Sequence, residues 1–149
     1  MPHLQYSIDI DAPREQVWTV LWSDTTYRDW TSVFSEGSYA VSDWNEGSKI
    51  QFLDPGGSGM SAIIDRKQPN ELMSFRHVAE IQNGQEQPPA AWSGAMETYT
   101  LATHGDGTRL TVDLDVTDEY RASFEQMFPK ALQRVKSLAE NQVTPRVTK

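Results

Sequence analysis

The chain has 149 residues, no cysteine and a formal net charge of −8 at pH 7, which fits one domain and excludes disulfides, thiolate nucleophiles and cysteine metal sites. The acidic excess argues against nucleic acid and anionic membrane surfaces as partners, because both are bound through Lys and Arg. No apolar run approaches the ~20 residues that span a bilayer, and the N-terminus lacks a signal-peptide pattern, so we expect a cytoplasmic protein. Aromatic residues make up 10%, with five tryptophans, which predicts a core built from large rings.

A strand that leads directly into two short helices is predicted at the N-terminal end. Residues 5–11 alternate apolar and polar side chains, with the period of a half-buried strand. Pro13 suits the first turn of a helix, where its missing N–H would be unpaired in any case. From Val17 to Trp22 the apolar side chains then recur on one helical face. A second short helix is expected over residues 24–30.

A series of antiparallel strands follows. We expect strands at 38–44, 48–53, 60–67, 72–82, 92–104 and 108–118, separated by turn residues rich in Gly, Asn and Asp. The clearest hairpin joins the last two strands across Gly105-Asp106-Gly107. In its second strand Leu110, Val112, Leu114 and Val116 face one way and polar side chains the other, which predicts a sheet with one dry face. The stretch 83–91 reads as a polar loop.

One long amphipathic helix is predicted to begin near Asp118, a residue that suits an N-cap. Its apolar stripe consists of Tyr120, Phe124, Met127, Ala131, Leu132, Val135 and Leu138. Pro129 lies inside this helix, so we expect a kink or local loosening near Glu125 to Pro129, because proline removes one backbone hydrogen bond. We expect the domain to comprise residues 1–141 and residues 142–149 to form a flexible tail.

This order of elements predicts an α+β fold, in which a bent antiparallel sheet wraps around a long C-terminal helix. A sheet with one dry face needs a cover, and the last helix is the only element long enough to provide it. One helix rarely fills the concave side of such a sheet, so we expect a cavity between the two.

Four segments carry a resemblance to the START-like or helix-grip superfamily, which includes Bet v 1-type allergens, polyketide cyclases and lipid-transfer domains. They are Ile8-x-Ile10-x-Ala12-Pro13-x-x-x-Val17-Trp18, Tyr27-x-x-Trp30, Trp44-x-x-Gly47 and Gly107-Thr108-x-Leu110. Over about residues 4–141 the sequence is most similar to the free-standing bacterial branch named for the activator of the Hsp90 ATPase. The resemblance implies an internal, largely apolar cavity between the sheet and the last helix. It carries over no catalytic residue, because the superfamily includes binders, carriers and enzymes alike.

The side chains expected to line this cavity are mainly aromatic and apolar. They are Trp30, Phe52, Phe75, His77, Trp92, Glu97, Tyr99, Leu110, Val112, Leu114, Phe124, Met127 and Phe128. His77 shares strand parity with Met73 and Phe75, which could place it in the cavity; the alternative is a structural or surface histidine.

Glu97 is the one catalytic candidate. It shares strand parity with Tyr99 and Leu101, so it faces inward if they do. A carboxylate in an apolar pocket could bind the polar end of a ligand or act as a general acid or base. If the parity slips at a bulge near Gly94, Glu97 would instead be exposed.

Neither a metal nor a cofactor is expected. The three histidines, His3, His77 and His104, lack the spacing of metal ligands, and His104 should be an exposed neighbour of a turn. The segment Gly56-Gly57-Ser58-Gly59 lacks the Lys-Ser/Thr of a phosphate-binding loop and leads into a strand, so it reads as a hairpin loop.

Three functions fit this reading. The first is binding of a small apolar or amphipathic molecule, lipid-like or polyketide-like, without chemistry. The second is a cyclase or hydratase that uses Glu97 with Tyr99 or His77. The third is a protein-interaction module of the Hsp90-activator kind, which a large exposed apolar patch would favour. A monomer is compatible with all three.

Overall fold

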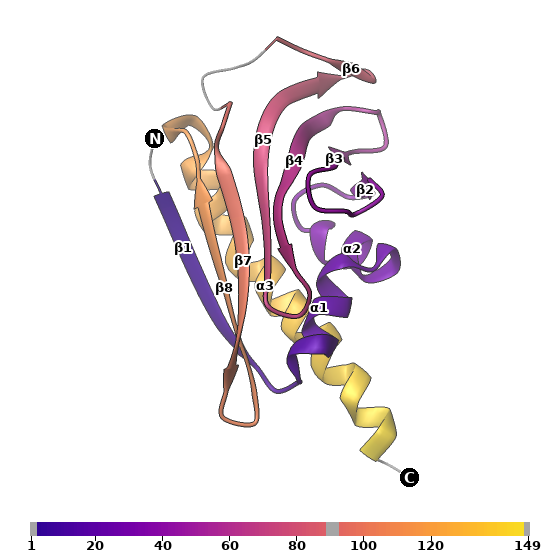
Figure 1. The fold of residues 1–149 in the computed structure, drawn as a ribbon, viewed down its shortest axis with the longest axis vertical. Coiled ribbons are helices and arrows are strands. Elements are labelled where there is room, and N and C mark those ends of the chain that lie inside the picture. Colours follow the sequence, from indigo (N-terminus) through magenta and orange to yellow (C-terminus); the bar gives the residue numbers. More distant parts are fainter. Residues whose placement is uncertain (1–2, 89–92, 148–149) are drawn as a thin grey trace.

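The computed structural model describes residues 3–88 and 93–147. An antiparallel sheet curves around one long helix, and two short helices lie against the sheet beside it (Figure 1). The strands are β1 (His3–Ile10), β2 (Tyr39–Val41), β3 (Lys49–Leu53), β4 (Gly59–Gln68), β5 (Leu72–Gln82), β6 (Gln85–Glu86), β7 (Met96–His104) and β8 (Gly107–Asp115), and the helices are α1 (Arg14–Trp22), α2 (Asp24–Thr31) and α3 (Asp118–Val147). The order in the sheet is β1-β8-β7-β5-β4-β3-β2, with β6 paired to β5. The predicted α+β helix-grip architecture is therefore confirmed.

The alternation seen in the sequence of β8 decides which side of the sheet is dry. Leu110, Val112 and Leu114 are buried, whereas Thr111 and Asp113 between them are half-buried. Because β8 lies between β1 and β7, its inner residues are flanked on both sides by inner residues of the neighbouring strands. The core of the domain therefore lies between this part of the sheet and the helices.

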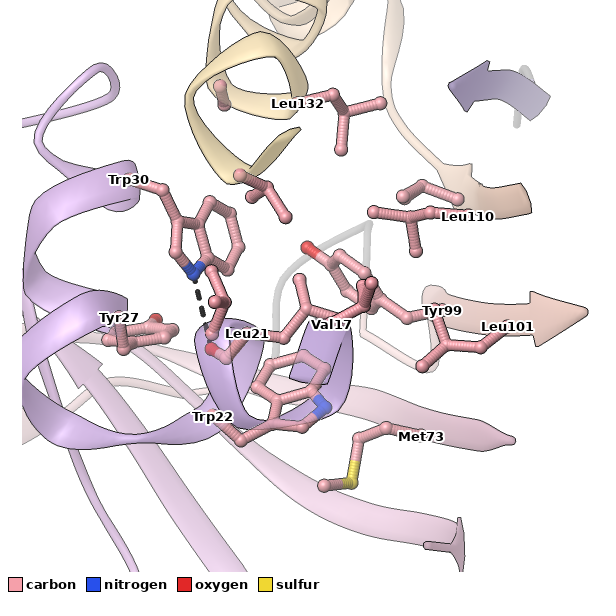
Figure 2. Packing of buried hydrophobic residues seen from close by; sticks show 14 of the residues in the cluster. Val17, Leu21, Trp22, Tyr27, Trp30, Met73, Tyr99, Leu101, Leu110 and Leu132 are labelled. Carbon is pink, nitrogen blue, oxygen red and sulfur yellow. Dashed lines mark hydrogen bonds between the residues drawn. The ribbon is translucent and has the colours of Figure 1, made fainter. Parts of the chain in front are cut away.

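The two short helices are joined through their side chains and backbone. Pro13 is the N-cap of α1, one position earlier than expected, and its carbonyl accepts hydrogen bonds from the backbone N–H of Gln16 at 3.0 Å and Val17 at 3.1 Å. The indole N–H of Trp30 in α2 donates to the carbonyl of Leu21 in α1 at 3.2 Å (Figure 2). Since both Leu21 and Trp30 are buried, this bond fixes α2 against α1 inside the core.

Helix α3 covers the concave side of the sheet with one buried stripe. The stripe consists of Phe128, Ala131, Leu132, Val135 and Ala139. Pro129 does not interrupt α3, which is one α-helix from Asp118 to Val147; the kink expected near Pro129 stays a prediction. Both Glu125 and Pro129 are exposed, so water can satisfy the carbonyl that lacks its N–H partner.

The start of α3 differs from the expectation, because Tyr120, predicted to be part of the apolar stripe, is 46% exposed. The helix continues to Val147. The domain boundary at residue 141 and the flexibility of residues 142–149 stay predictions. None of the described helices is long and apolar enough to cross a bilayer.

Local backbone geometry explains why β2 is shorter than predicted and why β6 is found within the expected polar loop. Trp44 has a φ of 64°, a left-handed conformation that a strand cannot contain. Its carbonyl accepts a hydrogen bond from Lys67 Nζ at 2.7 Å, which holds this turn against β4. Asn83 and Gly84 have φ values of 51° and 82°, the combination of a tight hairpin turn, and they connect β5 to β6.

The bend of the sheet is concentrated where β4 pairs with β5. The register of this pair shifts between Ser61 and Ala62 and again between Ile64 and Arg66, and such bulges increase the local twist and bending of strands. At Gly59 the backbone of β3 passes so close that a Cβ atom would lie 1.8 Å from the Phe52 carbonyl oxygen. Only glycine fits there.

Candidate functional site

A cavity of about 290 Å³ lies between α2, the strands β3, β4, β5 and β7, and the first half of α3. It is lined by Trp22, Tyr27, Trp30, Thr31, Phe34, Ser35, Ser38, Tyr39, Phe52, Leu53, Asp54, Ser58, Gly59, Met60, Phe75, His77, Glu97, Tyr99, Phe124, Met127 and Phe128. A second cavity of about 260 Å³ adjoins it. Gly59, Met60, His77, Glu97 and Phe124 line both. The two compartments thus share a boundary that includes the polar side chains of His77 and Glu97.

Trp22, at the end of α1, lies at the centre of the aromatic wall. Its ring centroid is 5.0 Å from that of Tyr99 and 5.4 Å from that of Phe75, both with edge-to-face geometry. The centroid of Trp30 lies 6.5 Å away, and Figure 2 shows the rings of Trp22, Trp30 and Tyr99 gathered between the helices and the sheet. Edge-to-face pairs at such separations are worth about 0.5–1.5 kcal/mol beyond their buried area, so the wall is held in one arrangement.

Three polar side chains converge within this aromatic surrounding. His77 Nε2 lies 2.9 Å from Glu97 Oε1, and the hydroxyl of Tyr99 donates a hydrogen bond to Glu97 Oε2. The His77 side chain is 8% exposed and that of Glu97 20%, so both are largely removed from solvent. We call these three residues the polar trio.

The pairing of β5 with β7 brings the polar trio together. Phe75 lies opposite Glu97, and Met73 lies opposite Tyr99, so alternate residues of the two strands share the inner face. The irregularity considered at Gly94 does occur, with a φ of 92°, but it precedes β7. The parity from Glu97 onward is therefore intact, and the inward orientation of Glu97 and His77 is observed.

The electrostatics of the polar trio favour an ionised carboxylate beside a neutral phenol. Burial would raise the pKa of Glu97, but the hydrogen bond and charge of His77 and the hydrogen bond from Tyr99 together hold that pKa below its ordinary value. Burial and the adjacent carboxylate raise the pKa of Tyr99 well above its usual range. Burial, with a smaller effect of Glu97, likewise raises the pKa of Tyr27. The cavity wall therefore carries an ionised Glu97 carboxylate at neutral pH.

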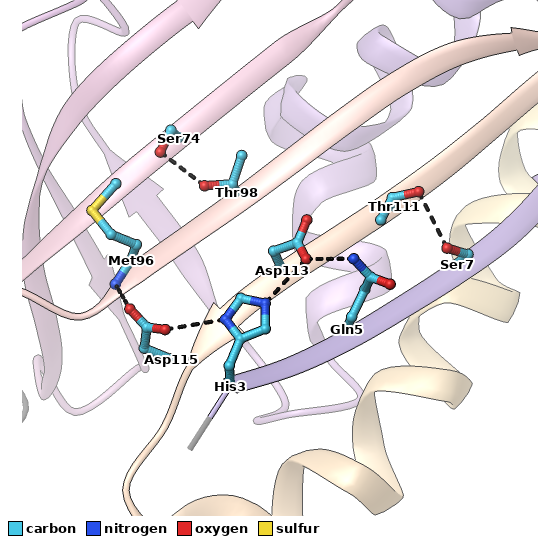
Figure 3. A network of polar contacts seen from close by, with 9 residues as sticks. All are labelled: His3, Gln5, Ser7, Ser74, Met96, Thr98, Thr111, Asp113 and Asp115. Carbon is cyan, nitrogen blue, oxygen red and sulfur yellow. Dashed lines mark hydrogen bonds and ion pairs between the residues drawn. The ribbon is translucent and has the colours of Figure 1, made fainter. Parts of the chain in front are cut away.

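The opposite face of the same strands is a polar surface (Figure 3). There Asp113 accepts hydrogen bonds from Gln5 Nε2 at 2.8 Å and from His3 Nε2 at 3.1 Å. Asp115 accepts one from His3 Nδ1 at 3.2 Å, and hydrogen bonds to these two carboxylates raise the pKa of His3. Asp9 is exposed, and so is His104, as expected. These contacts tie β1 to β8, and Asp115 also lines the second cavity.

Most of the predicted cavity residues lie in the cavity. Trp30, Phe52, Phe75, His77, Glu97, Tyr99, Phe124, Met127 and Phe128 line the first compartment. Leu114 lines the second. Leu110 and Val112 line neither, because they lie deeper along β8, where Leu132 and Val135 of α3 complete a closed core. Trp92 lies outside the described residues.

From the two short helices, the sequence predicted only Trp30 as a cavity residue and missed two others. Trp22 and Tyr27 are buried and line the first cavity, although the sequence pattern assigned them only to helix faces. Phe34 and Tyr39, from the segment after α2, also line it, as does Met60 at the start of β4. The Tyr27-x-x-Trp30 pair was a usable signal, because both rings fall on one side of α2.

Within the part of the chain that the structure describes, no three His, Asp or Glu side chains come together in a way that could hold a metal ion. The segment Gly56-Gly57-Ser58-Gly59 forms the turn between β3 and β4, where the Asp54 carboxylate accepts hydrogen bonds from the backbone N–H of Gly56 at 2.9 Å and Ser58 at 3.0 Å. The Asp54 side chain thus holds the backbone of this loop in place.

Comparison with known proteins agrees with this architecture. The family model described as activator of Hsp90 ATPase homolog 1-like protein matches residues 11–140. The solution structure of the Aha1 dimer from Colwellia psychrerythraea is 19% identical, with a TM-score of 0.74 over 94% of this chain and 97% of that one. No curated protein sequence matches significantly.

Two further structures share the fold. Protein MLL2253 from Mesorhizobium loti is 15% identical, with a TM-score of 0.75 over 94% of this chain and 98% of that one. DynU16, from the dynemicin biosynthetic locus, is 15% identical, with a TM-score of 0.68 over 91% of this chain and 46% of that one. At these identities the likeness concerns the fold.

Proposed function

The chain belongs to the family of activator of Hsp90 ATPase homolog 1-like proteins, and from this premise we propose that it binds a small, mainly apolar molecule in the cavity between sheet and helix α3. The observation that carries the proposal is an aromatic cavity of about 290 Å³ with a largely buried carboxylate on its wall. Binding sites for small molecules are commonly apolar hollows with a few placed polar groups.

The sizes and energies are compatible with binding in the micromolar range. A ligand that places a bicyclic aromatic body against Trp22, Trp30 and Phe75 would remove apolar surface from water on both partners. At about 25 cal/mol per Å² this burial can supply the roughly −8 kcal/mol of a micromolar complex. The second compartment offers room for a substituent beyond the polar trio.

Calorimetric titration with 2-naphthol tests this proposal. We expect micromolar binding, a negative heat-capacity change, a higher melting temperature and quenching of tryptophan emission, because Trp22 and Trp30 line the cavity. If 2-naphthol and a varied set of apolar aromatics and lipids change neither the heat signal nor the melting temperature, the proposal is wrong.

An acid–base enzyme is the second candidate, and the polar trio is the observation that favours it. The fold likeness to DynU16, named for a biosynthetic locus, is compatible with a cyclase or hydratase. However, the hydrogen bonds from His77 and Tyr99 hold the pKa of Glu97 down, which makes Glu97 a weaker base. We therefore place binding first.

Exchange of a carbon-bound proton separates the two candidates. A bound ketone such as 2-tetralone would exchange its α-hydrogens in D₂O faster with the wild type than with E97Q if Glu97 acts as a base. Binding without such exchange supports a pure binding protein.

A protein-interaction module receives less support from the surface. Among the described residues, the large hydrophobic side chains that are exposed are Val41 at 49% and Tyr120 at 46%. They belong to β2 and to the start of α3, which does not amount to the apolar patch that such a module needs.

A further inference from the structure

We infer that the cavity selects ligands whose polar end donates hydrogen bonds, above all a protonated amine, and discriminates against ligands that end in a carboxylate. This inference rests on the proposed binding function and specifies the chemistry of the ligand.

The hydrogen-bond directions within the polar trio leave acceptors facing the ligand. The hydroxyl hydrogen of Tyr99 is used by Glu97 Oε2, so the Tyr99 oxygen can only accept a further bond. An ionised carboxylate accepts and cannot donate, so the hydrogen between His77 Nε2 and Glu97 Oε1 belongs to His77. Two carboxylate oxygens have about four acceptor sites, of which these neighbours use two. A ligand that reaches Glu97 must therefore supply a donor.

Three further donors on the cavity wall are engaged within the protein. The hydroxyl of Thr31 donates to the carbonyl of Tyr27 at 2.6 Å, and that of Ser38 donates to the carbonyl of Ser35 at 2.6 Å. The indole N–H of Trp30 points away to Leu21, as described above. A carboxylate on a ligand would have to displace an internal bond to reach any of these three donors.

Lysine and arginine are missing from the part of the cavity wall that the structure describes. No Lys or Arg is among the described residues that line either compartment, whereas Asp54, Glu80, Glu97 and Asp115 are. Arg28 approaches one wall residue from outside, with its guanidinium carbon 5.2 Å from the Tyr39 ring centroid. Its charge is paired with Asp24 at 2.9 Å.

The aromatic wall adds a second attraction for a cation. The faces of Trp, Tyr and Phe rings carry a negative potential that attracts ammonium groups within about 6 Å. Trp22, Tyr27, Trp30, Phe52, Phe75 and Tyr99 all line the first compartment. A carboxylate placed among them would meet both these faces and Glu97, and like charges at short range in a desolvated site repel strongly.

Three ligands with one bicyclic body test the inference by calorimetric titration at pH 7: 2-naphthylmethylamine, 2-naphthol and 2-naphthoic acid. We expect the amine to bind at least about tenfold tighter than the acid, with the alcohol between them. The reason is that the Glu97 carboxylate attracts the ammonium group and repels the carboxylate of the acid. E97Q keeps the shape of the side chain and removes the charge, so the gap between amine and acid should shrink to about threefold or less.

Asp113→Asn is the matched control, because it removes the same charge from the outer face of the neighbouring strand β8 and should leave the gap unchanged. An acid that binds as tightly as the amine to the wild type overturns the inference and leaves the binding function standing. An amine preference that persists in E97Q overturns the role of Glu97. If none of the three ligands binds the wild type, the inference fails, and the binding function fails with it when the varied set of apolar aromatics and lipids also gives no signal.

Discussion

Replacing Glu97 with glutamine should destabilise the protein by about 1–2 kcal/mol and leave its fold intact. Two donors, His77 Nε2 at 2.9 Å and the Tyr99 hydroxyl, point at the carboxylate. A glutamine amide has one oxygen and one NH₂ group in the same place, so one donor would face another unless His77 changes its tautomer. A hydrogen bond to a charged group contributes about 1.5–3 kcal/mol. The lower end applies because the side chain retains 20% exposure.

Thermal unfolding followed by circular dichroism at pH 7 measures this effect. A domain of this size shifts by about 2–4 °C for each kcal/mol, so the melting temperature of E97Q should fall by about 2–8 °C. Asp113→Asn is again the control, because Asp113 also accepts two side-chain hydrogen bonds, from Gln5 and His3, but on the outer face. Asp113→Asn should lower the free energy of unfolding by less than about 1 kcal/mol. Equal melting temperatures for wild type and E97Q would refute the reasoning.

The pH dependence supplies an independent check on the same residue. The pKa of Glu97 is lower in the folded protein than its ordinary value of 4.5, so the folded state favours the ionised form. This contribution to stability is complete above pH 4.5 and is lost as the pH falls through the folded pKa. The difference in stability between wild type and E97Q should therefore become smaller in acid. A gap that stays constant from pH 7 to pH 3 would contradict the argument.

Three further substitutions test the cavity and its frame. Met127→Trp should place a ring in the cavity and weaken 2-naphthol binding at least about tenfold by calorimetry, because a single-site ligand cannot share filled space; unchanged affinity would mean that the ligand binds elsewhere. Gly59→Ala should cost about 1–3 kcal/mol in urea unfolding, since its Cβ would lie 1.8 Å from the Phe52 carbonyl oxygen, and a neutral result would disprove this close approach. Pro129→Ala should raise the urea midpoint, by at most the ~3 kcal/mol that proline costs inside a helix; a lower midpoint would show that Pro129 stabilises the native state.

Elements with a strong local period could be predicted from the sequence. The alternation from Leu110 to Val116 identified a strand with one dry face, and the spacing of Leu132 and Val135 identified the covering helix. Turn residues such as those at 105–107 set the hairpin between β7 and β8. These features follow from neighbouring residues alone, because side-chain direction repeats every 2 residues in a strand and every 3.6 in a helix. The order of such elements was then enough to predict the fold and the presence of a cavity.

The boundaries that failed are those where one backbone conformation overrides the pattern. The strand predicted up to Trp44 ends at Val41, because Trp44 takes a φ of 64°, which a bulky residue adopts only when surrounding contacts impose it. At Pro129 the helix continues without interruption. Because the residue is exposed, the hydrogen bond that proline removes lies away from the buried side of the helix.

The composition of the site was decided by the tertiary structure. Parity showed that Glu97 and His77 could each face inward, but only the register of β5 with β7, with Phe75 opposite Glu97, brings His77 to 2.9 Å from that carboxylate. Leu110 has the same parity as Leu114, yet it is fully buried and lines neither compartment, whereas Leu114 lines the second. Parity states which face a side chain occupies. How far the opposite layer stands from that face depends on bulges, bends and helix packing between residues distant in the chain, and this distance separates a cavity wall from a filled core.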